Sequence, residues 1–177
     1  MGISPGNLYY HFKNKEEIIR VLVQNAMQTF TDEWDNPQIP PLKRFLVIIN
    51  KVMLAWQECL FFKKELVVLL SKDSELKRSY RKNTETIFEK AQLLFQELVQ
   101  SGMLQTPEDS KVFESLLTIS TIIVEYWLTF LELNEKPLTE ENLREGSDLI
   151  IQLWCPYFRE DALAELNRLN ENFNKEQ

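Results

Sequence analysis

Apolar residues recur at helical spacing along almost the whole chain, and this pattern restricts the possible folds more than any other feature. One face of a helix over residues 42–56 carries Leu42, Phe45, Ile49, Val52 and Trp56. Similar patterns run through residues 18–30, 87–99, 112–130 and 161–173, and no segment alternates apolar and polar residues as a half-buried strand does. The sequence therefore predicts an all-α protein that forms a single helical bundle.

Capping residues, prolines and a glycine divide this pattern into separate helices. Asn14 and Thr139 are each predicted to cap the start of a helix. Pro40-Pro41 starts another helix, and its apolar pattern continues through residues 61–70 with a bend in the helix. A long helix capped by Ser74 or a neighbour ends before Gly102, which is well placed as its C′ residue.

Charge, cysteines and apolar run lengths exclude several classes of protein. The two cysteines, Cys59 and Cys155, are too few for a disulfide framework, and no zinc-ligand spacing occurs. No apolar run approaches the ~18–20 residues of a membrane span, and the N-terminus carries no basic-then-apolar signal segment, so we expect a cytoplasmic protein. The net charge of −7 argues against nucleic-acid binding. This charge is unevenly distributed, because residues 1–30 carry a net charge of +1 and the remaining residues carry a net charge of −8.

The most informative stretch lies at the N-terminus, over residues 2–19. Ser4-Pro5 predicts the capped start of a short helix in which Leu8 and Phe12 share one face and pack inward. The opposite face then carries hydroxyl, amide and imidazole groups, which suit contacts to phosphates and to a groove. Gly6, which is costly inside a helix, leaves room for a close approach.

The spacing from Ser4 through Leu8-Tyr9 and His11-Phe12 to Asn14-Lys15 resembles the recognition-helix signature of the tetracycline-repressor (TetR) family of transcription regulators. The stretches 61–81 and 156–158 resemble the regulatory domain of one branch of that family more weakly. The resemblance implies a ligand-responsive DNA-binding regulator, by default a repressor, that works as a homodimer on operator DNA. The residues that it implies for DNA binding are Gly6, Asn7, Tyr9, Tyr10, His11 and Lys15.

The resemblance also implies two domains: a partial helix-turn-helix head over residues 1–24 and a ligand-binding and dimerisation domain over residues 25–177. Two helices that precede the recognition helix in the family, about 30 residues, have no counterpart here. We therefore expect this polypeptide to bind operator DNA poorly. The chain is then either a fragment or mis-started version of a longer regulator, or a headless dimerisation module that titrates a full-length partner.

Aromatic residues of the helical body are candidates for a pocket that takes a small apolar or amphipathic effector, although aromatics at helical spacing also form ordinary cores. The candidates are Trp56, Phe62, Phe88, Tyr126 and Trp127, with Glu125. Glu125 interrupts an apolar run, so it is either an anchor for a cationic or hydroxylated ligand or one half of an ion pair.

Two further regions, Val112–Leu131 and Ile150–Trp154, carry more apolar surface than one stripe requires, and we expect them to form a homodimer interface. The only histidine is His11, and no phosphate-binding loop, nucleophile elbow or metal-ligand pair occurs. We therefore expect no enzymatic activity, no cofactor and no metal.

Overall fold

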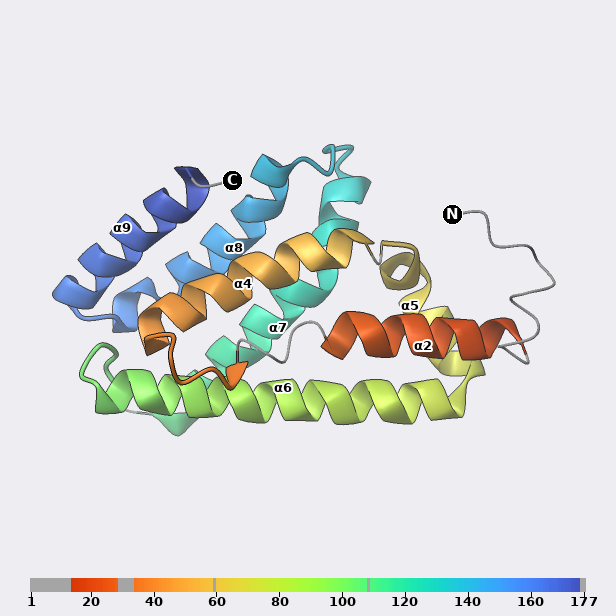
Figure 1. The fold of residues 1–177 in the computed structure, drawn as a ribbon, viewed down its shortest axis with the longest axis horizontal. Coiled ribbons are helices and arrows are strands. Elements are labelled where there is room, and N and C mark those ends of the chain that lie inside the picture. The colour runs from red at the N-terminus through yellow and green to blue at the C-terminus, as the bar shows by residue number, and fades with distance from the viewer. Residues whose placement is uncertain (1–13, 29–33, 59, 108, 176–177) are drawn as a thin grey trace.

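The computed structural model describes residues 14–28, 34–58, 60–107 and 109–175, and in these ranges the chain is built from α-helices (Figure 1). The helices are α2 (Lys15–Gln28), α4 (Pro41–Glu58), α5 (Leu60–Lys72), α6 (Ser74–Gln100), α7 (Ser110–Leu133), α8 (Glu140–Trp154) and α9 (Glu160–Lys175). A short 3₁₀ helix, η1 (Cys155–Tyr157), separates α8 from α9 at Pro156. The predicted all-α class is confirmed.

Local sequence signals determine where these helices start. The side chain of Asn14 accepts a hydrogen bond from the Glu17 amide at 2.9 Å. Thr139 caps α8 in the same way, as predicted. The N-cap of α6 is Asp73, the neighbour of Ser74, and its carboxylate accepts from two amides of the first turn.

The end of α6 is also determined by residues close to it in the sequence. Gly102 adopts φ +73°, a left-handed conformation that glycine adopts without strain. The Met103 amide then donates to the Leu98 carbonyl at 2.9 Å, and the Gly102 amide to the Val99 carbonyl at 2.9 Å. This is the Schellman arrangement, which ends α6 and turns the chain toward α7.

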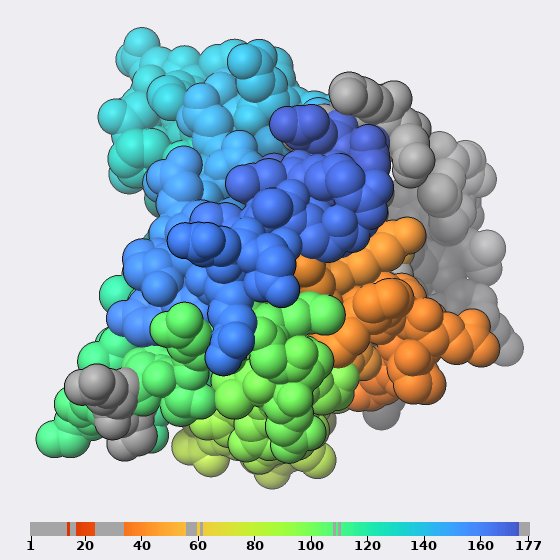
Figure 2. All heavy atoms as spheres, turned by 90° about the vertical axis from the view of Figure 1, so that its left-hand side faces the viewer, coloured from red at the N-terminus to blue at the C-terminus, as the bar shows by residue number. Residues whose placement is uncertain are grey.

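The bundle is organised around α4, which packs against α6, α7, α8 and α9. In Figure 1, α2 lies along the N-terminal half of α6, apart from α8 and α9. Seen from the end of the bundle in Figure 2, α9 lies between the start of α8 and the C-terminal end of α6. The helix that follows the predicted recognition segment is therefore placed at the opposite end of the molecule from α9.

One close contact fixes α8 on α7. A Cβ atom at Gly146 would lie 2.6 Å from the Trp127 ring, nearer than real Cβ contacts allow. The Trp127 indole N–H donates to the Asn142 carbonyl at 2.8 Å. Glycine is needed here because the indole lies directly on the backbone of α8.

Candidate ligand-binding site and interaction surfaces

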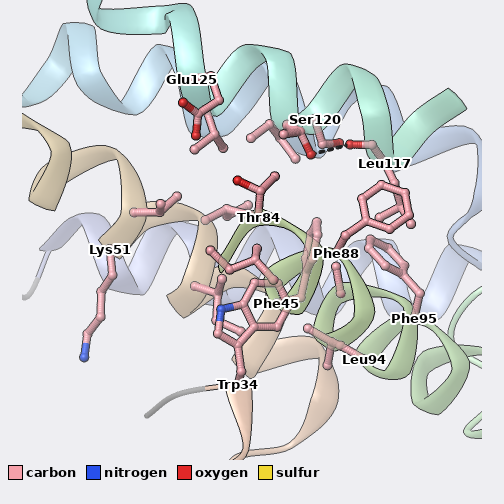
Figure 3. A pocket seen from close by; sticks show the side chains of 18 of the residues that line it. Trp34, Phe45, Lys51, Thr84, Phe88, Leu94, Phe95, Leu117, Ser120 and Glu125 are labelled. Atoms are coloured by element: carbon pink, nitrogen blue, oxygen red, sulfur yellow. Dashed lines mark hydrogen bonds between the residues drawn. The ribbon is translucent and has the colours of Figure 1, made fainter. Parts of the chain in front are cut away.

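A cavity of about 130 Å³ lies between α4, α6 and α7 and is lined almost entirely by apolar side chains (Figure 3). The three helices bring together apolar stripes that are far apart in the sequence. The lining residues are Trp34, Phe45, Ile48, Ile49, Lys51, Val52, Asn83, Thr84, Ile87, Phe88, Ala91, Leu94, Phe95, Leu117, Ser120, Thr121, Val124, Glu125, Ile150 and Trp154.

Aromatic rings close one end of this cavity. Phe95 stacks on Trp154 with ring centroids 3.9 Å apart, and Phe45 meets Phe95 edge-on at 5.7 Å. The fully buried Trp154 indole donates to the Ser120 hydroxyl at 3.0 Å. These contacts hold the rings in place, so this end of the cavity has a defined shape.

The other end of the cavity carries polar groups, among them Glu125. The Lys63 ammonium lies 2.5 Å from the Glu125 carboxylate, and the Lys63 side chain is only 1% exposed. The Tyr80 hydroxyl donates to the same carboxylate oxygen. Burial, together with the Glu125 charge, raises the pKa of Tyr80, so this phenol stays protonated and acts as a donor. Of the two roles open to Glu125, the structure places it in an intramolecular ion pair at the cavity wall.

The structure brings some of the predicted ligand residues together and leaves others apart. Phe88 and Glu125 line the cavity. Phe62 and Trp127 are buried elsewhere, Phe62 beside the Tyr80 ring and Trp127 against Phe130. Tyr126 is 55% exposed on the outside of α7. The side chain of Trp56 lies outside the described residues.

Several cavity residues were not among the sequence candidates, notably Trp34, Asn83 and Thr84. For Asn83 a signal exists in the sequence, because it shares an i, i+4 stripe with Ile87 and Ala91 and is the polar member of that stripe. Trp34 has no such signal, since its place depends on the long-range contacts of residues 34–36.

That segment is held by two charged contacts. The guanidinium of Arg44, a buried residue of α4, donates to the Trp34 carbonyl at 3.3 Å and to the Asn36 carbonyl at 3.4 Å. Lys90 of α6 forms an ion pair with Asp35. Trp34 therefore forms part of the cavity wall on a segment that is held to α4 and α6.

An ion-pair cluster also attaches α2 directly to the start of α6. Arg20 donates to both carboxylate oxygens of Asp73, at 2.7 and 3.1 Å, and to Glu75 at 2.5 Å. The hydrogen bond from Arg20, with those from the Leu76 and Glu75 amides, holds the pKa of Asp73 below its usual value. Since Asp73 is also the N-cap of α6, the same carboxylate orders that helix and binds α2.

The outward face of α7 carries an exposed apolar stripe. Exposed apolar side chains recur at helical spacing, at Ile119, Ile122, Tyr126, Phe130 and Leu133. They agree with the apolar surface predicted for Val112–Leu131. The prediction for Ile150–Trp154 needs correction, because Ile150, Ile151 and Trp154 are buried within this chain. The exposed large apolar side chain next to this segment is Leu149, since the stripe of Ile150, Ile151 and Trp154 faces the core.

The segment Lys111–Leu133 is long and apolar enough to cross a membrane by length and composition alone, the one such helix in the described part of the chain. The core helix of a soluble protein meets the same test, and here Leu116, Leu117, Leu128 and Leu131 are buried in the bundle. Within the described residues, no group of three or more His, Cys, Asp or Glu side chains is arranged to hold a metal.

The predicted DNA-binding residues Gly6, Asn7, Tyr9, Tyr10 and His11 lie outside the described residues, as does the side chain of Lys15. Cys59 also lies outside them, while Cys155 is a half-buried free thiol at the end of α8. The structure thus describes the body of the protein and the helix that follows the predicted recognition segment.

Comparisons with known proteins agree with this architecture. The chain is similar to a TetR-family transcriptional regulator from Marinobacter aquaeolei, with 26% identity and a TM-score of 0.81 over 97% of this chain and 83% of that one. A TetR transcription regulator from Haloarcula marismortui has the same fold, with 15% identity and a TM-score of 0.66 over 89% of this chain and 82% of that one. No curated protein matches the sequence.

The TetR family model, described as a bacterial transcriptional repressor, matches residues 23–166. This range includes all the helices that enclose the cavity and the apolar stripe of α7. Proteins of this family are transcription factors and not enzymes. The match covers most of the chain, and the chain therefore belongs to the TetR family of transcriptional regulators.

Proposed function

We propose that this chain belongs to a ligand-responsive, DNA-binding repressor of the cytoplasm that acts as a homodimer and takes a small apolar or amphipathic effector into its cavity, with operator DNA bound by the full-length form. The observation that carries this proposal is the position of Trp34, which lines the cavity and follows α2 in the chain. A molecule bound in the cavity would contact the segment that leads directly to α2. The head and body boundary expected near residue 24 falls within this helix.

The contacts of α2 support a coupling between ligand and head. Its N-terminal half is held to α6 through Arg20 and Asp73, and Ile19 and Val23 are buried against the body. The segment that contains Trp34 is tied to α4 by Arg44. A ligand that moves Trp34 therefore acts on α2 from one end while the Arg20 contact holds the other. Such a ligand shifts the protein between states only if it binds one of them better.

The exposed stripe of α7 supports a homodimer. Five large apolar side chains on one face of a helix form a surface that a soluble protein normally covers with a partner. The same stripe on a second copy is self-complementary under two-fold symmetry, and pairs of helices from the two copies then pack as a four-helix bundle. On α8, Leu149 is exposed, whereas Ile150 and Trp154 are buried.

For DNA binding, we assign the operator contacts to Gly6, Asn7, Tyr9, Tyr10, His11 and Lys15, as the family resemblance implies. Lys15 is the first residue of α2 and the other five come before this helix in the chain, so a change in the position of α2 changes their spacing between the two copies of a dimer. Two recognition helices reach successive major grooves only at a separation of about one helical turn of DNA. A ligand that alters this separation would release the operator.

A distance measurement between the two α2 helices tests the ligand response without knowledge of the operator. A spin label placed at Leu22, which is 60% exposed on α2, reports this distance by double electron–electron resonance. The label needs a Cys59→Ser, Cys155→Ser background. With saturating isopropylbenzene as an apolar probe, we expect the distance to change by about 1–2 Å, the scale of helix shifts in regulated proteins.

A label at Lys77, exposed on α6, is the matched control, and its distance should stay constant. An unchanged Leu22 distance in a dimer that demonstrably binds isopropylbenzene would contradict the ligand response. A chain that stays monomeric at micromolar concentration would contradict the homodimer.

A further inference from the structure

The cavity is longer than a small ligand, so its two ends offer such a ligand separate places to bind. Two contacts between α6 and α7 mark these ends, the hydrogen bond from Tyr80 to Glu125 and the ring contact of Phe95 with Phe113. Tyr80 and Phe95 are fifteen residues apart on α6, which corresponds to about 22 Å along the helix axis. At about 130 Å³ the cavity is close in volume to engineered cavities of about 150 Å³ that bind benzene. A ligand of that size reaches only one end.

The end at Glu125 has a carboxylate oxygen that the fold does not use. The Lys63 ammonium and the Tyr80 hydroxyl both donate to the same oxygen of this carboxylate, Oε2. Within the part of the chain that the structure describes, the second oxygen, Oε1, accepts no hydrogen bond. Glu125 lines the cavity with 20% of its side chain exposed, and in Figure 3 it lies on the wall formed by α7, on the side that faces Thr84. One strong acceptor is therefore open to a ligand at this end.

The side chains near this carboxylate offer a ligand further acceptors rather than donors. Thr121, one turn before Glu125 on α7, donates its hydroxyl hydrogen to a backbone carbonyl of its own helix at 2.9 Å, and Thr84 does the same on α6 at 3.1 Å. The amide nitrogen of Asn83 is a donor, but it is buried and has no surface toward the cavity. The indole of Trp34 lies across the cavity from Glu125 in Figure 3. A ligand group placed beside Glu125 therefore has to be a hydrogen-bond donor.

The charges at this end favour a neutral donor over a cation. Lys63, whose side chain is 1% exposed, already balances the charge of Glu125. An ammonium on the ligand would add a second positive charge, and if it took Glu125 from Lys63 it would leave a buried ammonium without its partner. Lys51 also lines the cavity, but in Figure 3 its ammonium points away from Thr84 and Phe88, so it is not directed at an anion. A hydroxyl group supplies the donor without any charge.

We infer that the effector is an uncharged molecule of about one ring in size that carries a hydroxyl group, and that this hydroxyl donates to Glu125 Oε1 while the apolar part extends into the cavity toward Phe88. This inference rests on the proposed function, since it specifies the ligand of the same cavity. It makes Glu125 a specificity-determining residue whose two oxygens differ in role. Oε2 joins α7 to Lys63 of α5 and Tyr80 of α6, and Oε1 binds the ligand.

Four probes of nearly equal shape test the inference by calorimetric titration of the full chain. They are 1-phenylethanol, which carries the hydroxyl, acetophenone, which can only accept, 1-phenylethylammonium, which is a cation, and isopropylbenzene, which is apolar. We expect 1-phenylethanol to bind at least about tenfold more tightly than acetophenone, because a hydrogen bond to a charged group is worth at least this factor. It should exceed the ammonium by at least about tenfold as well, because the cation loses hydration beside a pair that is already balanced.

Two results with wild type would overturn the inference. Acetophenone that binds as tightly as 1-phenylethanol would show that the ligand oxygen accepts a hydrogen bond, for instance from the Trp34 indole, and does not donate one. Tighter binding of 1-phenylethylammonium would show that Glu125 takes a cation in spite of Lys63.

The variant Glu125→Gln tests the assigned atom. Lys63 and Tyr80 both donate to Oε2, so the amide oxygen has to take this place and the amide nitrogen takes the place of Oε1. The atom open to the ligand then changes from an acceptor to a donor. We expect the ratio of 1-phenylethanol to acetophenone affinity to fall at least about tenfold. Retained isopropylbenzene binding shows that the variant is folded, and if it is not, the four probes on wild type alone decide the inference.

The matched control is Glu132→Gln on the same helix. It removes a carboxylate from an exposed ion pair with Lys64, and it should leave the ratio unchanged because Glu132 does not line the cavity. A ratio that falls equally in both variants would show an effect of net charge and would overturn the role of Glu125. An unchanged ratio in folded Glu125→Gln would also overturn it.

The failure of this inference is distinguishable from that of the proposed function. If the neutral probes bind wild type without preference for the hydroxyl, the effector class is overturned while a ligand-binding cavity stands. If none of the four probes binds, both the effector class and the ligand-binding part of the proposed function are contradicted.

Discussion

The two faces of α7 are similarly apolar but have different surroundings. On the inward face Leu131 is fully buried, whereas Leu133, two positions later on the outward face, is 79% exposed. The inward face packs on α8, α4 and α5 and contributes Leu117 and Val124 to the cavity wall. On the outward face, Ile122 is 52% exposed.

This difference shows that hydropathy alone does not identify what an apolar surface is for. A helix that only completes a core needs one apolar stripe, and α7 has two. The first is used by the fold and by the cavity. The second remains for a partner, and under the proposed function that partner is a second copy of the chain.

The largest effect should come from the inward face, through Leu131→Ala. Removal of a fully buried leucine side chain is expected to lower the free energy of unfolding by about 2–5 kcal/mol, because transfer and cavity terms add. The matched variant Leu133→Ala should change it by about 0.5 kcal/mol or less in the monomer. Urea denaturation measures both, and equal losses would show that the two faces do not differ as described.

On the outward face, Ile122→Glu should dissociate the dimer. A carboxylate in the centre of a self-complementary apolar surface faces its own copy and loses hydration, so we expect the dimer dissociation constant to rise at least about hundredfold. Light scattering measures the mass of the variant, and circular dichroism checks that its helix content is retained. A variant that remains dimeric would place the interface elsewhere.

The contact between α7 and α8 gives a third, intermediate prediction. Gly146→Ala pushes a methyl group into the Trp127 ring, and overpacking of this kind costs about 1–3 kcal/mol. In a Trp127→Leu background the added cost should be smaller, because the smaller side chain leaves room. Denaturant unfolding of the two single variants and the double variant measures this coupling. An Ala at position 146 without effect would contradict the close packing.

The smallest effect concerns α2 and depends on pH. The pKa of Asp73 is held below its ordinary 3.8, so its ion pair with Arg20 contributes stability that is complete above this value and is lost as the pH falls through the lowered pKa. Asp73→Asn keeps an oxygen that caps α6 but removes the charge. The protection of α2 amides against hydrogen exchange, taken relative to the intrinsic exchange rate at each pH, should therefore fall in wild type as the pH drops below 3.8, and much less in the variant. The same pH response in both would exclude Asp73 as its source.

Much of the fold was predictable because its determinants are local. Two helices start at side-chain caps, from Asn14 and Thr139, and α6 ends at Gly102. These signals act over a few residues, and the sequence identifies them directly. The break between α4 and α5 was predicted only as a bend in a continuing pattern. The burial of Ile150 and Trp154 was not predicted, because apolar periodicity does not tell whether a face meets its own chain or a partner.

The site was predictable only in part, because its contacts are long-range. Glu125 was identified as unusual, but its partner Lys63 is 62 positions away and no spacing rule connects the two. Phe88 was predicted and lines the cavity, whereas Trp34 and Asn83 lie there through the tertiary packing of α6 against the segment after α2. The DNA-binding assignments remain predictions.

Titration of isopropylbenzene into the Ile122→Glu variant tests most directly whether α7 serves a ligand on one face and a second copy on the other. We predict a folded monomer that binds this probe with an affinity within about threefold of wild type, since the substituted residue is exposed and does not line the cavity. A folded monomer that no longer binds the probe would contradict the separation of the two faces.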